Sequence, residues 1–110
     1  MKTLDEIFSQ PNIMRAQKLP FIGQGAYIYR LGKPWATVVI TPGSVTDHVS
    51  VQPMKCGSNF TPEEIEWLKT LFFKPGELDG TPETSKFNNT VHFWLHHVAK
   101  EDENDPQMDA

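Results

Sequence analysis

The chain has 110 residues, enough for one hydrophobic core and too few for two ordinary domains. Its single cysteine, Cys56, excludes an intrachain disulfide and a cysteine-rich zinc site. No apolar run approaches the roughly 20 residues that span a bilayer, and Asp5 and Glu6 stand where a signal peptide would be apolar. We therefore expect a cytoplasmic protein that does not enter a membrane.

The net charge of -4 is concentrated at one end of the sequence. Residues 100–110 hold five of the fourteen acidic residues and one of the ten basic residues, so nine of each remain in residues 1–99. We predict a single α+β domain over residues 1–99 and a disordered acidic tail over residues 100–110. A neutral domain without a basic stripe disfavours nucleic-acid binding, which needs Lys and Arg to neutralise phosphates.

A short helix is predicted near the beginning of the sequence. Thr3 can cap it, and Glu6 three residues later completes a capping box. Pro11 ends this helix early, because proline lacks an amide hydrogen and clashes with the preceding turn. Residues 12–18 are then predicted to form a second helical turn before Pro20.

From Gly25 onward the residue pattern alternates with a period of two, which is typical of strands. Residues 26–31 and 35–40 are rich in aromatic and β-branched side chains, and they flank Gly32-Lys33-Pro34, which suits a hairpin turn. A third strand is expected over residues 48–52. Together these segments predict an antiparallel meander of three strands.

The most clearly marked element is a helix from about residue 61 to about residue 73. Thr61 is a natural N-cap, Pro62 suits the first helical position, and Glu64 completes a capping box. Apolar residues recur at helical spacing along one side of it, namely Ile65, Leu68, Leu71 and Phe72. A polar loop is expected over residues 77–86.

The last element, residues 91–98, is ambiguous between helix and strand because apolar residues and histidines are interleaved. Its aromatic residues and the preceding Asn88-Asn89 favour a strand. The predicted fold class is therefore α+β, an antiparallel sheet of about four strands in the order β-β-β-α-β. One main helix is expected on one face of the sheet, together with the short N-terminal helix.

The other face of this sheet is expected to remain open. Val49 and Val51 would point toward the helix, so the residues between them on the strand point away. The open face is predicted to collect His48, Ser50, Gln52, His92, Trp94 and His96, with Tyr27 and Tyr29 or Arg30 from the first hairpin. Such a mixture of aromatic and neutral hydrogen-bonding groups suits either a subunit interface or a small planar, polar ligand.

Clustered histidines can also indicate a metal site, since imidazole is a common metal ligand. His92 and His96 would lie about 13 Å apart along one strand, at about 3.3 Å per residue, which is too far to bind one ion. A metal site would need His48 from the other strand and a carboxylate as well. We predict no metal and no cofactor.

His48 and Ser50 form a His-x-Ser pattern, which small phosphoesterases of the two-histidine class use in duplicate. The sequence has no second copy, because His92 is followed by Phe93-Trp94 and His96 by His97-Val98. We therefore assign no catalytic residue.

Several segments resemble a family of small phage-encoded proteins of unknown function. That family pairs a His-Val-Ser-Val strand with a helix that opens on a proline, followed by an Asn-Asn pair and a final strand rich in His, Leu and Trp. The matching segments here are residues 48–51, Pro62, Asn88-Asn89 and residues 92–96, and the resemblance covers about residues 35–97. It implies a viral context and transfers no catalytic residue.

Three functions follow as hypotheses. The first is a phage accessory protein in the cytoplasm of an infected bacterium, an inhibitor of host defence that binds a host protein or sequesters a small polar ligand through the open face. The second is a minimal phosphoesterase or nucleotide hydrolase that uses His48 with His92 or His96. The third is a homo-oligomer that buries the open face against a copy of itself. The lack of a complete catalytic set favours the first hypothesis over an enzyme.

Overall fold

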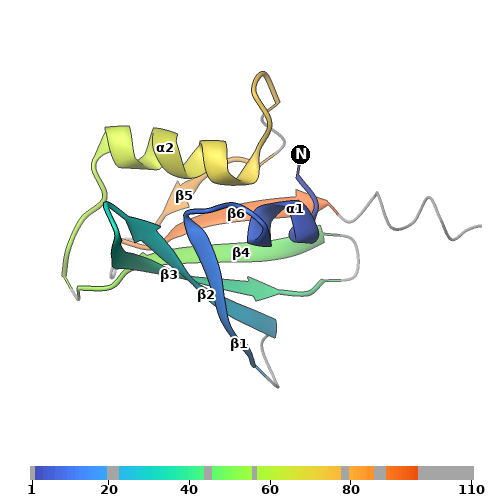
Figure 1. Cartoon of the computed structure of the whole chain (residues 1–110). Helices are drawn as coiled ribbons and strands as arrows, with labels where there is room; N and C mark the ends of the chain where they lie inside the picture. The colour runs from blue at the N-terminus through green and yellow to red at the C-terminus, as the bar shows by residue number, and fades with distance from the viewer. Residues whose placement is uncertain are drawn as a thin grey trace, which may run out of the picture.

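Within the residues that the structure describes, six antiparallel strands form one open sheet, and two helices lie over the same face of it (Figure 1). The computed structural model describes residues 2–19, 23–43, 46–55, 57–77, 80–85 and 89–96, without the side chains of residues 16–19, 23 and 96. The elements are α1 (Leu4–Phe8), β1 (Ile13–Leu19), β2 (Gly23–Arg30), β3 (Lys33–Thr41), β4 (Thr46–Pro53), α2 (Pro62–Phe72), β5 (Glu83–Thr84) and β6 (Val91–His96). The strands are ordered β1-β2-β3-β4-β6-β5. None of the helices in these ranges is long and apolar enough to cross a membrane.

The predicted α+β fold class is confirmed, but the sheet has six strands rather than about four. Strands β2, β3 and β4 form the expected meander, and β6 pairs antiparallel with β4. The two strands that carry most of the predicted site residues are therefore neighbours in the sheet. Residues 97 and 98 of the predicted final strand lie outside the described residues, as does the predicted tail over residues 100–110.

The prediction of a second helical turn over residues 12–18 is wrong, because this segment forms β1. Strand β1 pairs with β2, with Ile13 opposite Ile28 and Met14 opposite Tyr27. Ile13 and Ile28 are both buried, and the pairing satisfies backbone groups that the edge of β2 would otherwise leave exposed. Long-range pairing of this kind overrides a weak local preference for helix.

The polar loop predicted over residues 77–86 contains a strand, β5, that the sequence did not indicate. Strand β5 has two residues, and it sets Glu83 opposite His92 and Thr84 opposite Val91. Two residues are too few to show alternation, so the pattern carries no strand signal. The pairing brings Glu83 to the edge of the sheet beside β6.

Both helices begin at the N-caps that the sequence indicates. In α2 the Thr61 hydroxyl accepts a hydrogen bond from the Glu64 backbone N–H at 3.1 Å, and the Thr61 N–H donates to the Glu64 carboxylate at 2.9 Å. Helix α1 has the same capping box, formed by Thr3 and Glu6. Both predictions are confirmed. A capping box is formed by residues close in sequence, so it can be recognised from the sequence alone.

The hydrophobic core lies between the sheet and the helices. Its centre is aromatic, with the ring of Phe93 on β6 at 5.1 Å from that of Phe72 and 5.7 Å from that of Phe73. Val49 and Val51 of β4 are fully buried on the same side, as the alternation predicts. Since the core takes every second residue of β4 and β6, the residues between them point to the other face.

The β2–β3 hairpin turns at Leu31 and Gly32, one position ahead of the predicted turn. Arg30 pairs with Lys33, which leaves a two-residue loop with φ angles of 55° at Leu31 and 78° at Gly32. Positive φ at both positions is typical of a type I′ turn, which favours Asn-Gly. Leu31 is 96% exposed, so burial of its side chain does not offset the free-energy cost of its left-handed backbone.

We therefore expect Leu31→Asn to raise the free energy of unfolding by about 1 kcal/mol, because Asn tolerates left-handed backbone better than Leu. Urea denaturation measures the change. Lys33→Asn is the matched control, since Lys33 lies in extended backbone next to the loop, and it should give no gain. Equal stability of the Leu31→Asn variant and the wild type would show that the backbone at Leu31 is not strained.

Candidate functional site

Four of the predicted site residues come together on the open face of the sheet. The pairing of β4 with β6 sets His48 opposite Trp94 and Ser50 opposite His92. Because strand side chains alternate, all four point away from the core, and all four are half-buried. We call these four residues the histidine cluster.

The two imidazoles of the cluster touch through ring nitrogens. His48 Nε2 lies 2.8 Å from His92 Nδ1, and Ser50 Oγ lies 3.2 Å from the same His92 nitrogen. The ring planes differ by only 9° and the centroids are 4.7 Å apart. Parallel rings stacked face to face would keep their atoms about 3.5 Å apart, so the shorter contact places the rings edge to edge. One ring nitrogen therefore donates a hydrogen bond to the other.

Trp94 forms one wall of the cluster. Its ring centroid is 5.6 Å from that of His48, with the planes tilted by 30°. A half-buried indole beside an imidazole removes part of the water from one side of that ring. The cluster thus combines two imidazoles, a hydroxyl and an aromatic surface on the two strands at the middle of the open face.

The surroundings of the cluster disfavour positive charge on His48. Burial lowers the pKa of His48 below its ordinary value of 6.5, and His92 lowers it further, while Glu83 acts in the opposite direction. Glu83 lies opposite His92, and it is the only charged residue among the described positions in register with the cluster. Sequence reasoning missed Glu83 because β5 is too short to be recognised.

The lowered pKa of His48 predicts acid sensitivity of the fold. A histidine whose pKa is lower in the folded state contributes stability that is fully present above the unfolded value, near 6.5, and is lost as the pH falls through the folded value. We expect the melting temperature of the wild type to fall more steeply below pH 6.5 than that of His48→Gln. Glu83→Gln should steepen this fall in melting temperature, because Glu83 raises the pKa of His48 whereas burial and His92 lower it. Parallel profiles for the wild type and His48→Gln would contradict this account.

Three other predicted site residues lie outside the cluster. Gln52 is on the same face of β4, two residues beyond Ser50, and it is half-buried. Tyr29 is half-buried on β2, two strands away from β4. The backbone of His96 pairs with Thr46 at the end of β6, and its side chain lies outside the described set.

Arg30, expected on the open face as the alternative to Tyr29, lies instead on the helix side. Its guanidinium is 2.8 Å from Glu64 Oε2 and lies over the rings of Trp35 at 5.3 Å and Trp67 at 5.2 Å. The alternation along β2 explains the placement, since Arg30 follows buried Ile28 by two residues. Arg30 therefore joins the β2–β3 hairpin to α2 and takes no part in the cluster.

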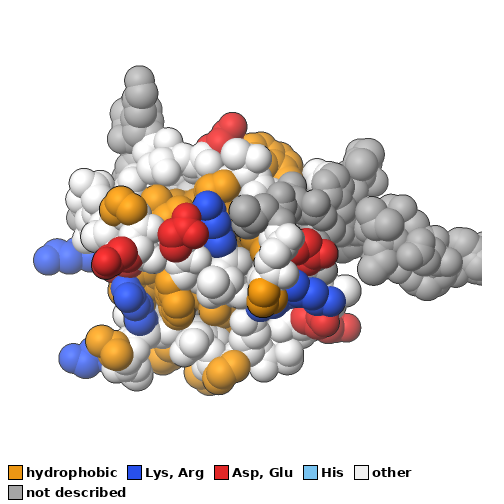
Figure 2. Space-filling model, turned by 90° about the horizontal axis from the view of Figure 1, so that it is seen from above, with side chains coloured by type: hydrophobic (Ala, Val, Ile, Leu, Met, Phe, Trp, Pro, Cys, Tyr) orange, Lys and Arg blue, Asp and Glu red, His pale blue; other side chains and the backbone are white. Residues whose placement is uncertain are grey.

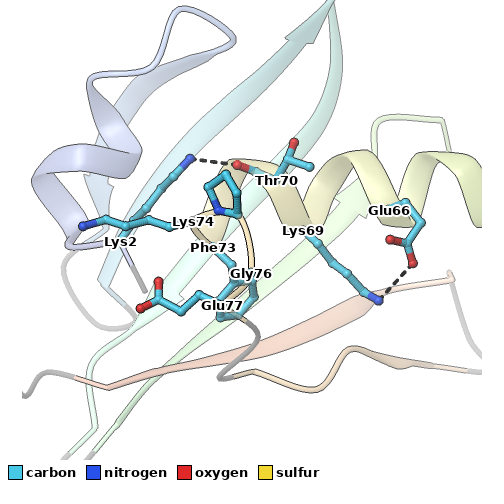
Figure 3. A pocket seen from close by; sticks show the side chains of 9 residues that line it. Lys2, Glu66, Lys69, Thr70, Phe73, Lys74, Gly76 and Glu77 are labelled. Atoms are coloured by element: carbon cyan, nitrogen blue, oxygen red, sulfur yellow. Dashed lines mark hydrogen bonds and ion pairs between the residues drawn. The ribbon is translucent and has the colours of Figure 1, made fainter.

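The helix side of the molecule has a pocket of about 540 Å³ at the end of α2 (Figure 3). Each of its three lysines has a partner. Lys2 Nζ donates to the Thr70 carbonyl at 2.7 Å, Lys69 pairs with Glu66 at 3.0 Å, and Lys74 lies 3.8 Å from the carboxylate of Glu6. A lysine at the C-terminal end of a helix is favoured by the helix dipole, so this arrangement supports the helix. Figure 2 looks onto this side, where charges of both signs alternate and no described histidine is visible.

The cluster differs from the catalytic arrangement that the His-x-Ser pattern suggests. A histidine acting on a phosphate needs its nitrogen at about 2.6–3.2 Å from an oxygen, and the direct contact of His48 with His92 leaves no space between them. No Lys or Arg stands among the described residues in register with the cluster to neutralise a phosphate. The described residues also contain no group of three or more His, Cys, Asp or Glu that could hold a metal ion.

Comparison of the chain with protein-family models, with curated proteins and with solved structures finds no match.

Proposed function

We propose that this chain is a phage accessory protein that acts by stoichiometric binding and contacts a host protein through the open sheet face. One observation carries the proposal: the histidine cluster is assembled on the face that the core does not use. A viral context, and with it inhibition of a host defence protein, comes from the resemblance of residues 35–97. The cytoplasm of the infected cell is where we place this activity.

A protein partner suits the open face better than a small ligand does. Small-molecule sites are concave, whereas the cluster lies on one side of an open sheet. On the same face Tyr27 is 38% exposed and Met14, opposite it on β1, is 57% exposed. Aromatic residues and methionine are enriched in protein interfaces, and charged residues are depleted at their centres.

Calorimetric titration of the purified chain against candidate host proteins and nucleotides tests the proposal. We expect one host protein to bind at a 1:1 ratio, with binding weakened at least about tenfold in Trp94→Ala, as for an aromatic hot spot. Glu63→Ala is the matched control, because Glu63 is exposed on α2, and it should bind like the wild type. No heat with proteins or nucleotides from a folded chain would contradict the proposal, as would equal binding by Trp94→Ala.

A minimal phosphoesterase or nucleotide hydrolase is the second candidate, and the contact between Ser50 Oγ and His92 Nδ1 favours it. In this function the imidazole would act as a base, and the His48 ring would have to turn away to admit a phosphate. The candidate requires turnover of a linear or cyclic nucleotide that disappears in His48→Ala while the fold survives. Equal turnover by His48→Ala, or none by the wild type, would exclude it.

A homo-oligomer is the third candidate, because the exposed Tyr27 and Met14 could be buried against a copy of the chain. Light scattering on the purified chain separates this candidate from the first. A monomer at micromolar concentration would exclude it.

A further inference from the structure

The two ring nitrogens at the centre of the histidine cluster lie almost as far apart as two ligands of one metal ion would. At a metal–nitrogen distance of about 2.0–2.1 Å, two nitrogens on one ion lie about 2.9 Å apart at a right angle and about 3.4 Å apart at the tetrahedral angle. His48 Nε2 and His92 Nδ1 are 2.8 Å apart. An ion would replace the hydrogen bond between them: the proton of the donating nitrogen moves to the other nitrogen of the same ring, and a rotation of either side chain brings the two nitrogens into the range that a metal ion requires.

The backbone holds these two side chains in position. His48 and His92 lie on paired strands, in adjoining rows of the β4–β6 ladder that sets His48 opposite Trp94 and Ser50 opposite His92. The fully buried Val49 and Phe93 between them anchor both strands to the core. Ligands on such a rigid sheet are preorganised, because little conformational freedom is lost when an ion binds.

The charged side chain that faces the two histidines, among the described residues in register with them, is an anion. Glu83 is directly opposite His92 on β5, where facing Cβ atoms lie about 4.5–5.5 Å apart, so its exposed carboxylate can reach the cluster. Among the described residues in register with the cluster, none is a Lys or an Arg. An anion would meet a carboxylate here, whereas a cation would be stabilised by it.

We propose that His48 Nε2 and His92 Nδ1 together bind one divalent metal ion of the zinc and copper type. The Glu83 carboxylate balances the charge of the ion, and water completes the coordination. Imidazole ligands suit zinc, copper and nickel, whereas magnesium and calcium prefer oxygen ligands. The proposal goes beyond the binding of a host protein and does not depend on it, because the ion needs only this chain.

Calorimetric titration of the full chain with zinc chloride, and separately with magnesium chloride, tests the metal site. We expect one zinc ion per chain and no binding of magnesium. Because loss of an outer partner of a metal ligand already weakens binding about 10- to 100-fold, His48→Gln and His92→Gln should each weaken zinc binding by at least about tenfold. Thr37→Ala is the matched control on the open face of β3, and it should bind zinc like the wild type.

A second measurement separates loss of the site from loss of the fold. In the wild type, imidazole nitrogen resonances of His48 and His92 should shift together when zinc is added, while the amide resonances of core residues stay in place. Three results would each overturn the proposal: no zinc binding by the wild type, zinc binding by both histidine variants that equals that of the wild type, or resonance shifts confined to other histidines. The titration contains no other protein, so a negative result would leave the proposed host-protein binding untouched.

Discussion

Phe93→Ala is expected to lower the free energy of unfolding by about 3–5 kcal/mol, the usual result of deleting a buried aromatic ring. Phe93 is fully buried on β6, and its ring packs against those of Phe72 and Phe73 at the centre of the core. Small domains have a stability of about 5–15 kcal/mol, so this single change removes a large part of it. Urea denaturation followed by circular dichroism measures the loss.

Trp94→Ala is the matched control, because Trp94 is the next residue on β6 and points to the open face. It is half-buried and outside the core, so we expect a loss of about 1 kcal/mol. Equal losses for the two variants would mean that both faces of β6 are packed alike, and the division between a core face and a binding face would be wrong.

Gly80→Ala is expected to lower the free energy of unfolding by about 1–3 kcal/mol, because it overpacks a filled site. A Cβ atom at Gly80 would lie 2.5 Å from Cζ of Phe73 and 3.1 Å from the carbonyl oxygen of Trp94. Phe73 is only 2% exposed, so its ring cannot move aside without disturbing the core. Thermal and urea denaturation measure the change.

Phe73→Leu provides the test of this cause, because it removes the ring atoms that the new methyl group would meet. In the double variant, Gly80→Ala should cost less than it costs in the wild type, a coupling that a double-mutant cycle measures. Additive losses would show that the methyl group does not meet Phe73.

The sequence allowed accurate prediction of elements that depend on local chemistry. Thr3 with Glu6 and Thr61 with Glu64 mark both helix beginnings, because a capping box is formed by residues three positions apart. The alternation along β4 and β6 correctly separated the core face from the face that carries His48, Ser50, His92 and Trp94.

Two elements and one contact could not be predicted, because they depend on pairing between distant segments. Strand β1 exists because β2 offers an edge, and β5 has only two residues. The sequence therefore did not indicate Glu83 as a site residue, although it faces His92. The contact between His48 and His92 depends on the register of β4 with β6, since a slip by one residue would send one of them into the core.

The central claim is that the open face, marked by the histidine cluster, is the binding surface of this protein. A photo-crosslinking amino acid tests it in infected cells when it is placed at position 27 on β2, where the open face is exposed and Trp94 stays intact, or at position 63 on α2 as the control. We predict a covalent adduct with one host protein from position 27 and none from position 63. An adduct from position 63 alone, or the absence of an adduct from position 27, would contradict the claim.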